Sequence, residues 1–234
     1  TAPTSSDCDN SKVFVGWSAT PIVGTTNTTP SDLFTDVDGS PAITTNVTFY
    51  AVFANRSGSA ATWTKVTSAP SDWSGDYVIT NAGGSYAMIS DFYSGSSGEF
   101  KSSSVTISSS NITSFPTDKM IWTFAKNGDN AQYSLKNKST GTYAKITGTS
   151  STNAALDASA VWFTISCSNG TCIISSVTNS ARAFAWYSTN STFRTYANTG
   201  NTYCNLYKKT GGYTYSNYAT TCCESLGQIN GPIM

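Results

Sequence analysis

Apolar and polar residues alternate along short segments of the chain, and clusters of Gly, Pro, Asn, Asp, Ser and Thr separate these segments. Val13–Trp17 and Asn46–Phe53 are the clearest examples. A period of two is typical of a β-strand with one buried face. The stretch from Thr25 to Pro41, rich in turn-forming residues, contains no helical pattern. The chain is therefore predicted to be all-β.

A longer pattern recurs three times in the second part of the chain. Each copy has a strand that ends near an asparagine, then a turn, and then a strand with an aromatic residue beside an alanine. The copies begin at Asp76, Gln132 and Cys172. Each unit closes on a further strand, Ile121–Phe124, Val161–Ile165 or Cys204–Tyr207. Three units of four strands, about twelve in all, predict a β-trefoil-like barrel, with a β-sandwich as the alternative.

The chain divides into parts by pattern and composition. Residues 1–58 are predicted to form a small β module, residues 62–209 the internally repeated module, and residues 210–234 a tail or the start of a further repeat. Asn55–Ala60, rich in Ser and Gly, has the composition of a linker. The length of 234 residues agrees with two modules.

Two strands of the first module carry a motif, Phe14-Val-Gly-Trp-Ser18 followed by Val47-Thr-Phe-Tyr-Ala-Val-Phe53. This pair of strands resembles the Listeria–Bacteroides repeat, also called the internalin B-repeat. The resemblance implies a β-grasp-like fold and a place among the spacers and ligand-presenting modules of bacterial surface proteins. That family has a further strand upstream, so we expect this module to be incomplete or completed by residues outside this sequence.

The second module also resembles a known type of domain. Its opening Trp63-Thr-Lys-Val-Thr, its Gly75-Asp-Tyr-Val-Ile and its closing Leu206-Tyr-Lys are similar to an uncharacterised module of large secreted or surface proteins of Bacteroidetes. The resemblance implies an extracellular or cell-surface location and other domains of the same polypeptide as partners. It implies no activity.

Charge excludes one class of partner. Charged residues make up 11% of the chain, against about 25% in an average domain, and 13 basic residues balance 13 acidic ones. Binding to nucleic acid requires a concentrated basic face, which this sequence lacks. The sequence also has no apolar run of about 18 residues, so we expect no membrane insertion.

Six cysteines add a structural constraint. Cys167 and Cys172 flank Asn169-Gly170, the strongest signal for a two-residue hairpin turn. Such a hairpin places Cys167 directly opposite Cys172, and we predict a disulfide bond between them, as in an extracellular protein. The pairing of the other four stays open: Cys8, Cys204, Cys222 and Cys223.

The chemistry of an enzyme is missing. The chain has no histidine, the commonest general base and metal ligand. Asp36-Val-Asp-Gly-Ser40 is a fragment of a calcium loop without its remaining ligands, so we expect no metal and no cofactor. A glycosidase would need two close carboxylates, but those of the second module lie mostly in turn-like contexts. They are Asp72, Asp76, Asp91, Glu99, Asp118, Asp129 and Asp157.

Aromatic residues beside arginines suggest where a ligand could bind. A period of two places three side chains of segment 182–187 on one face, and these candidates are Arg182, Phe184 and Trp186. Arg194 and Tyr196 follow in the next strand, and Asp91 and Tyr93 lie in a Ser/Gly-rich loop. Flat aromatic rings beside polar groups suit sugars. Core packing is the alternative, and the Gln-x-Trp signature of ricin-type lectins is absent.

These features favour a non-catalytic recognition module of a secreted or cell-surface bacterial protein, with a glycan or a host or cell-surface protein as its partner. A structural spacer that presents another domain is one alternative. A fragment of a glycan-active enzyme is another.

Overall fold

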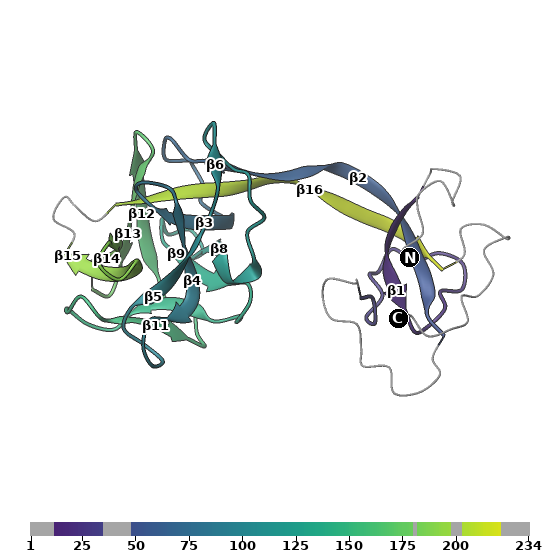
Figure 1. The fold of residues 1–234 in the computed structure, drawn as a ribbon, viewed down its shortest axis with the longest axis horizontal. Coiled ribbons are helices and arrows are strands. Elements are labelled where there is room, and N and C mark those ends of the chain that lie inside the picture. Colours follow the sequence, from purple (N-terminus) through teal and green to yellow (C-terminus); the bar gives the residue numbers. More distant parts are fainter. Residues whose placement is uncertain (1–11, 35–47, 180–181, 198–202, 221–234) are drawn as a thin grey trace. The chain divides into compact units, whose positions relative to one another are not determined.

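The computed structural model describes residues 12–34, 48–179, 182–197 and 203–220. These residues form strands and turns, with one 3₁₀ turn at Asp118–Met120 (Figure 1). The all-β prediction is confirmed. No helix in these ranges is long and apolar enough to cross a membrane.

The chain divides into two compact units, and each has its own core. Unit 1 comprises residues 1–60 and 211–234, and unit 2 comprises residues 61–210. Strands β2 (Tyr50–Lys65) and β16 (Cys204–Ala219) contribute residues to both. Residues 211–219, predicted from the sequence to belong to a tail or a further repeat, continue β16 and belong to unit 1.

Asn55–Ala60, which composition predicts to be a linker, lies within β2, which pairs with β16. Hydroxyl groups join the two strands, with 2.6 Å between Ser57 Oγ and Thr214 Oγ1 and 2.7 Å between Thr62 Oγ1 and Thr210 Oγ1. Cross-strand pairs of this kind stabilise a sheet even where its side chains are exposed. Composition alone hides such a strand, since Ser and Gly are also the residues of linkers.

Six strands of unit 2 form a closed barrel. They are β3 (Gly75–Asn81), β8 (Ile121–Lys126), β9 (Tyr133–Asn137), β12 (Phe163–Ser168), β13 (Thr171–Ser176) and β16. Each pairs antiparallel with the next in this order. β16 then pairs with β3, Leu206 opposite Ile79, which closes the ring.

Three hairpins alternate with pairs of barrel strands along the chain. They are β4–β5 (Tyr86–Phe92, Phe100–Ser104), β10–β11 (Tyr143–Ile146, Ala154–Asp157) and β14–β15 (Arg182–Tyr187, Thr192–Ala197). A six-stranded barrel with three hairpins is the defining arrangement of one fold. Unit 2 is a β-trefoil. The prediction is confirmed, and the alternative of a β-sandwich is wrong.

Nearly half of the residues in the trefoil core are aromatic, and six of their rings are wholly shielded from water: Tyr77, Phe100, Trp122, Phe163, Phe184 and Phe193. Trp122 also satisfies its polar atom, because the indole Nε1 donates to the carbonyl oxygen of Met88 at 3.1 Å. A short hairpin, β6 (Ile107–Ser108) and β7 (Asn111–Ile112), adds a smaller cluster, in which β7 pairs with β2 and Ile112 faces Trp63.

Unit 1 is built on β1 (Val13–Ser18), which pairs antiparallel with β2. The phenylalanine–glycine–tryptophan motif has a steric reason: Gly16 has a φ of +148°, and a Cβ there would lie 2.5 Å from the carbonyl oxygen of Phe34. Trp17 is buried and exchanges two backbone hydrogen bonds with Phe34. The β-grasp-like fold stays a prediction, and Asp36–Ser40 lie outside the described residues.

The predicted hairpin of the second module is present as β12–β13. Asn169 and Gly170 both have positive φ angles, 51° and 76°, as a two-residue hairpin turn requires. Cys167 lies opposite Cys172, and their sulfur atoms are 2.10 Å apart, at bonding distance. On β16, the other neighbour of β13, Cys204 also lies opposite Cys172. Its thiol is free and fully buried, and burial raises the pKa of this thiol to about 12.

Replacing both Cys167 and Cys172 by serine is expected to lower the melting temperature by only a few degrees. The bridge closes a very short loop, and the loss of chain entropy that it imposes on the unfolded state is therefore small, about 2 kcal/mol or less. Peptide mapping of protein prepared without reductant checks the bond, and calorimetry of the double variant checks its effect. Two free thiols in the first experiment, or a protein that no longer folds in the second, would contradict the prediction.

Candidate ligand-binding site

Parts of all three trefoil hairpins meet around the loop that joins β4 to β5. β5 pairs with β15, where Phe193 lies opposite Phe100. Gly98 exchanges two backbone hydrogen bonds with Ala154, at the start of β11. The loop after β10 is also fixed, because Thr195 Oγ1 of β15 donates to the carbonyl oxygen of Ser150 at 2.8 Å. Residues far apart in the sequence are thus held side by side.

A buried carboxylate lies at this meeting point. The side chain of Glu99 is 9% exposed and pairs with Arg194, with 2.5 Å between Nη2 and Oε1. Its other oxygen accepts hydrogen bonds from Thr192 Oγ1 at 2.5 Å and from Asn190 Nδ2 at 3.5 Å. Burial alone would raise the pKa of Glu99, but the hydrogen bonds from Arg194 and Thr192 outweigh it and hold the pKa below its usual value. The carboxylate is therefore ionised at neutral pH.

Arg194 is fixed from two sides. Its guanidinium carbon lies 3.5 Å from the centre of the Tyr187 ring, in addition to the ion pair with Glu99. The hydrogen bond to Glu99 is the largest of the influences that raise the pKa of Arg194. A stacked and paired guanidinium positions the carboxylate precisely.

A small hollow opens beside Glu99. It has a volume of about 150 Å³, and its lining is Tyr93, Ser94, Ser97, Gly98, Glu99 and Thr152. Tyr93 is 51% exposed, and its backbone N–H donates to the carbonyl oxygen of Glu99 at 2.9 Å. The hollow thus combines a half-exposed aromatic ring, three hydroxyl groups and one fixed negative charge. This combination suits a small polar ligand with hydroxyl groups and an apolar face.

One of the residues predicted from the sequence lines this hollow, and a second holds one of its lining residues. Tyr93 lines it, and Arg194 fixes the carboxylate of Glu99. Trp186 lies elsewhere, half-buried between two rings: Tyr86 stacks on it at 5.1 Å between centroids, and Phe193 packs edge-on at 5.3 Å. Tyr86, which is 39% exposed, stacks on the Trp186 ring and covers part of it.

The structure corrects the prediction for Phe184. Phe184 is wholly buried and packs on Phe100 and Phe163, so it has no surface to offer a ligand. The alternating pattern left core packing as the alternative for this face of β14, and Phe184 follows it; Ala183 and Ala185 on the opposite face are buried as well. β14 is therefore covered on both faces.

The remaining candidates are held by neighbours of their own. Arg182 Nη1 donates to the carbonyl oxygen of Thr195 at 3.2 Å, and Tyr196 is half-buried. Asp91 forms an exposed ion pair with Lys119 at 2.8 Å. Their predicted contacts with a ligand stay predictions.

Sequence reasoning missed Glu99 as the centre of the site. In the sequence, Glu99 is only one of several scattered carboxylates. Its partners Arg194, Thr192 and Asn190 lie more than 90 positions away, so no local pattern links them to it. Tyr86 was also missed as the ring that covers Trp186. The recurring Tyr-Ala pair, which includes Tyr86 and Ala87, was the one available signal for it.

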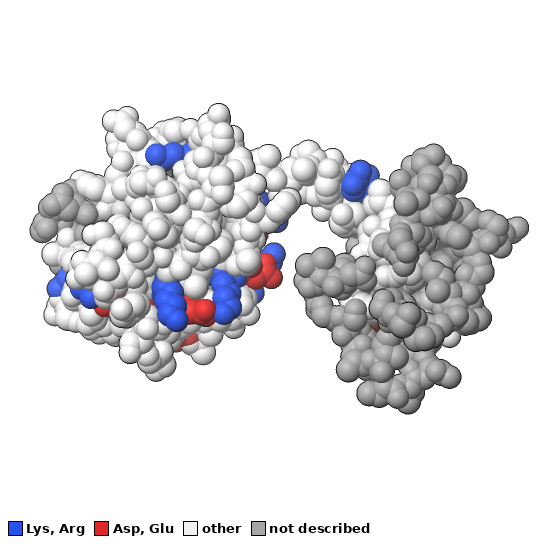
Figure 2. Space-filling model, viewed as in Figure 1, with Lys and Arg blue, Asp and Glu red and all other residues white. Residues whose placement is uncertain are grey.

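The charges of unit 2 are mostly paired. Figure 2 shows lysine and arginine side chains interspersed with acidic ones in one band of unit 2, while most of the face in view is uncharged. The pairs are Lys119–Asp91, Lys138–Asp118, Lys145–Asp157, Arg194–Glu99 and Lys209–Asp76. Within the ranges that the structure describes, no group of three His, Cys, Asp or Glu side chains could hold a metal ion.

No known protein family matches the chain, and no curated protein does. Among solved structures, the chain is similar to the designed three-fold symmetric protein ThreeFoil, with 14% identity over 56% of this chain and 97% of that chain, and a TM-score of 0.45. It is also similar to the Rhizoctonia solani agglutinin, with 17% identity, 64% and 99% coverage, and a TM-score of 0.45. It is also similar to the BEL beta-trefoil, with 12% identity over 60% of this chain and 96% of that chain, and a TM-score of 0.42. The trefoil assignment rests on the closed barrel and the three hairpins of this chain itself.

Proposed function

We propose that unit 2 is a non-catalytic carbohydrate-recognition module of a secreted or cell-surface bacterial protein. The observation that carries this proposal is the half-exposed ring of Tyr93 beside the ionised carboxylate of Glu99, in a hollow lined with hydroxyl groups. Sugars offer what such a site recognises, namely C–H faces for an aromatic ring and hydroxyl groups for a fixed acceptor.

The geometry favours a single terminal sugar unit. A volume of about 150 Å³ is below the roughly 300–1,000 Å³ of drug-sized ligand sites. Glu99 would accept hydrogen bonds from the sugar hydroxyls, while Arg194 and Thr192 keep the carboxylate in place. A preformed site loses little entropy on binding, which offsets its small contact area. A negative charge in the hollow favours neutral sugars over acidic ones.

The location is part of the same proposal. A bond between Cys167 and Cys172 is typical of proteins in oxidising compartments. The resemblance of the first module to the Listeria–Bacteroides repeat supports a bacterial surface protein as the source.

Replacing Tyr93 by alanine is expected to weaken binding of a neutral glycan about tenfold, because the sugar loses its stacking partner. The intact chain is first screened on an array of neutral and acidic glycans, and each glycan that binds is titrated against the variant. Tyr215→Ala is the matched control, since Tyr215 is an exposed tyrosine outside unit 2. An array without binding overturns the proposed function. Binding that Tyr93→Ala leaves unchanged overturns this site.

A structural spacer is the second candidate. The hydroxyl pairs between β2 and β16 favour it, because they order a polar segment that composition predicts to be flexible. Glycan arrays would then be silent. Proteolysis would also spare residues 55–60, whereas a flexible linker would be cut there first.

A further inference from the structure

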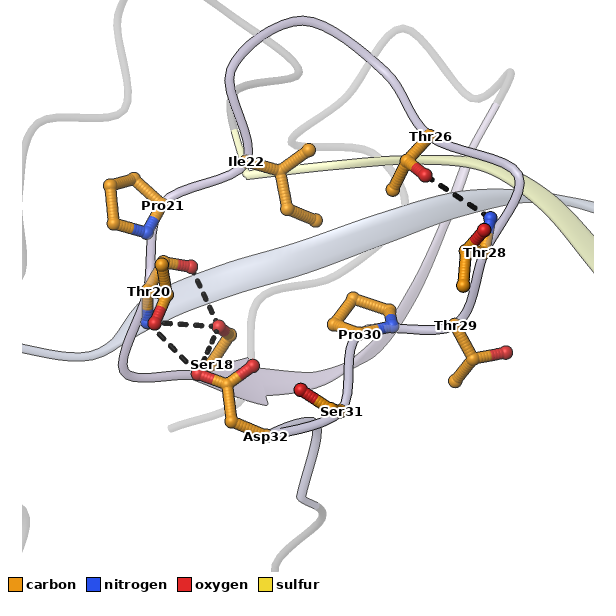
Figure 3. A pocket seen from close by; sticks show the side chains of 10 residues that line it. All are labelled: Ser18, Thr20, Pro21, Ile22, Thr26, Thr28, Thr29, Pro30, Ser31 and Asp32. Carbon is orange, nitrogen blue, oxygen red and sulfur yellow. Dashed lines mark hydrogen bonds between the residues drawn. The ribbon is translucent and has the colours of Figure 1, made fainter.

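A larger hollow lies in unit 1, and it shares no lining residue with the proposed sugar site. It has a volume of about 420 Å³, and residues between Ser18 and Asp32 line it. In Figure 3 the side chains of Ser18, Thr20 and Asp32 gather at one end, with Ile22 and Pro30 in the middle of the hollow. The lining is thus apolar in its middle part and polar around a single carboxylate.

The segment that lines the hollow is fixed before any ligand arrives. Ile22 exchanges two hydrogen bonds with the hydroxyl of Thr220, at 2.9 and 3.1 Å. Thr26 exchanges two backbone hydrogen bonds with Tyr218 of β16, at 3.0 and 2.7 Å. Pro30 restricts the backbone further. A ligand would therefore meet a formed surface, which reduces the entropy lost on binding.

Asp32 is the one charged residue of the lining. Its Oδ2 accepts hydrogen bonds from Ser18 Oγ at 2.9 Å and from the backbone N–H of Thr20 at 3.1 Å. Burial would raise the pKa of Asp32, but these hydrogen bonds together hold it below its usual value, so the group is ionised at neutral pH. Both of these contacts are with Oδ2. The Ser18 hydroxyl also lies 2.6 Å from the carbonyl oxygen of Thr20, and the side chain of Thr20 and the backbone of Asp32 also hydrogen-bond the carboxylate.

We propose that this hollow binds a primary ammonium group at the end of an aliphatic chain, as in the lysine side chain of a partner protein. The ammonium lies against Asp32, and the methylene groups lie on Ile22, Pro21 and Pro30. The hydroxyl groups of the lining accept the remaining ammonium protons. The matching element is a charge at the end of an apolar stem, which lysine provides.

The same geometry favours lysine over arginine. A guanidinium binds a carboxylate best through two parallel hydrogen bonds, which require both oxygens. Oδ2 of Asp32 already accepts two hydrogen bonds from Ser18 and Thr20. An ammonium is a point charge and needs only the other oxygen.

Titration of the isotope-labelled full chain, followed by nuclear magnetic resonance, tests the proposal. The probes are Nα-acetyl-lysine methylamide, its arginine counterpart, its Nε-acetylated form and n-butylamine. A single side chain is expected to bind with a dissociation constant of about 1 mM, or about −4 kcal/mol. The lysine probe should shift the amide signals of residues 18–32, with the arginine probe several-fold weaker and the neutral acetylated probe without effect.

The variants separate the carboxylate from general charge. Asp32→Asn should weaken binding of the lysine probe at least about tenfold, whereas Asp129→Asn, which removes an exposed acidic group from unit 2, should leave it unchanged. Unchanged amide signals of Trp17 and Tyr218 show that Asp32→Asn still folds. If n-butylamine binds as tightly as the lysine probe, both free amines and protein lysines fit the site. If n-butylamine binds more weakly, the ligand is a lysine side chain of a protein. Equal binding of the acetylated probe, or no shifts in residues 18–32 at about ten times the expected dissociation constant, overturns the proposal.

Discussion

Replacing Phe184 by alanine is expected to lower the free energy of unfolding of unit 2 by about 3–5 kcal/mol. Phe184 is wholly buried and packs on Phe100 and Phe163. The variant therefore loses the burial of a large ring and leaves a cavity beside the rings of Phe100 and Phe163. The total free energy of unfolding of a typical domain is only about 5–15 kcal/mol. Urea denaturation followed by circular dichroism measures the difference.

Trp186→Ala is the matched control on the same strand. Trp186 is half-buried, and its replacement is expected to cost roughly half as much or less, because water already reaches part of the ring. If both variants unfolded at the same urea concentration as the parent chain, β14 would have an exposed face. Equal and large losses would mean that the stacking of Tyr86 on Trp186 stabilises the fold as much as the core does.

These two residues show where sequence patterns are and are not sufficient. The period of two placed Phe184 and Trp186 on one face of a strand, which is correct. It could not show that Phe184 is covered, because the rings that pack on it, Phe100 and Phe163, belong to other strands and come from distant positions in the sequence. The degree of burial is a property of the assembled barrel.

The trefoil itself was predictable because an asparagine recurs at the end of a strand in each repeat, although its hydrogen bonds differ from copy to copy. Asn81 accepts a hydrogen bond from the backbone N–H of Tyr86. Asn137, at the equivalent place in the second unit, accepts from the backbone N–H groups of Ser139 and Thr140. A residue type that recurs beside a turn leaves a repeat in the sequence even where its partners differ. Asn179, in the looser third copy, donates instead to the carbonyl oxygen of Ile146.

The candidate site was only partly predictable, for the opposite reason. Glu99 and Arg194 lie on hairpins from different repeats, and no local pattern links them. Tyr93 could be named as a candidate because a tyrosine in a Ser/Gly-rich loop costs little entropy to order and is common in recognition surfaces. Local rules thus identified the exposed ring and missed the carboxylate beside it.

Arg194→Met is expected to destabilise unit 2 by about 3 kcal/mol, more than Glu99→Gln does. Without the guanidinium, the largely buried carboxylate of Glu99 keeps its charge but loses its counterion, which is costly in a poorly hydrated place. In Glu99→Gln the guanidinium of Arg194 still lies over the Tyr187 ring. Arg194 is also more exposed than Glu99, so the loss of its ion pair costs less free energy. A double-mutant cycle with both replacements should give a coupling energy of about 2 kcal/mol.

The pH dependence of stability provides a second measurement of the same pair. The pKa of Glu99 is lower in the folded chain than in the unfolded one, so the unfolded state binds the proton more readily. The stabilisation is therefore fully present above the ordinary glutamate pKa of about 4.3, and it is lost as pH falls through the lower pKa of the folded state. Unfolding free energies of the parent chain and of Glu99→Gln, measured from neutral to acidic pH, should differ at neutral pH and converge in acid. A constant difference would show that Glu99 acts through its shape and hydrogen bonds, and that its charge does not contribute to the stability of the folded chain.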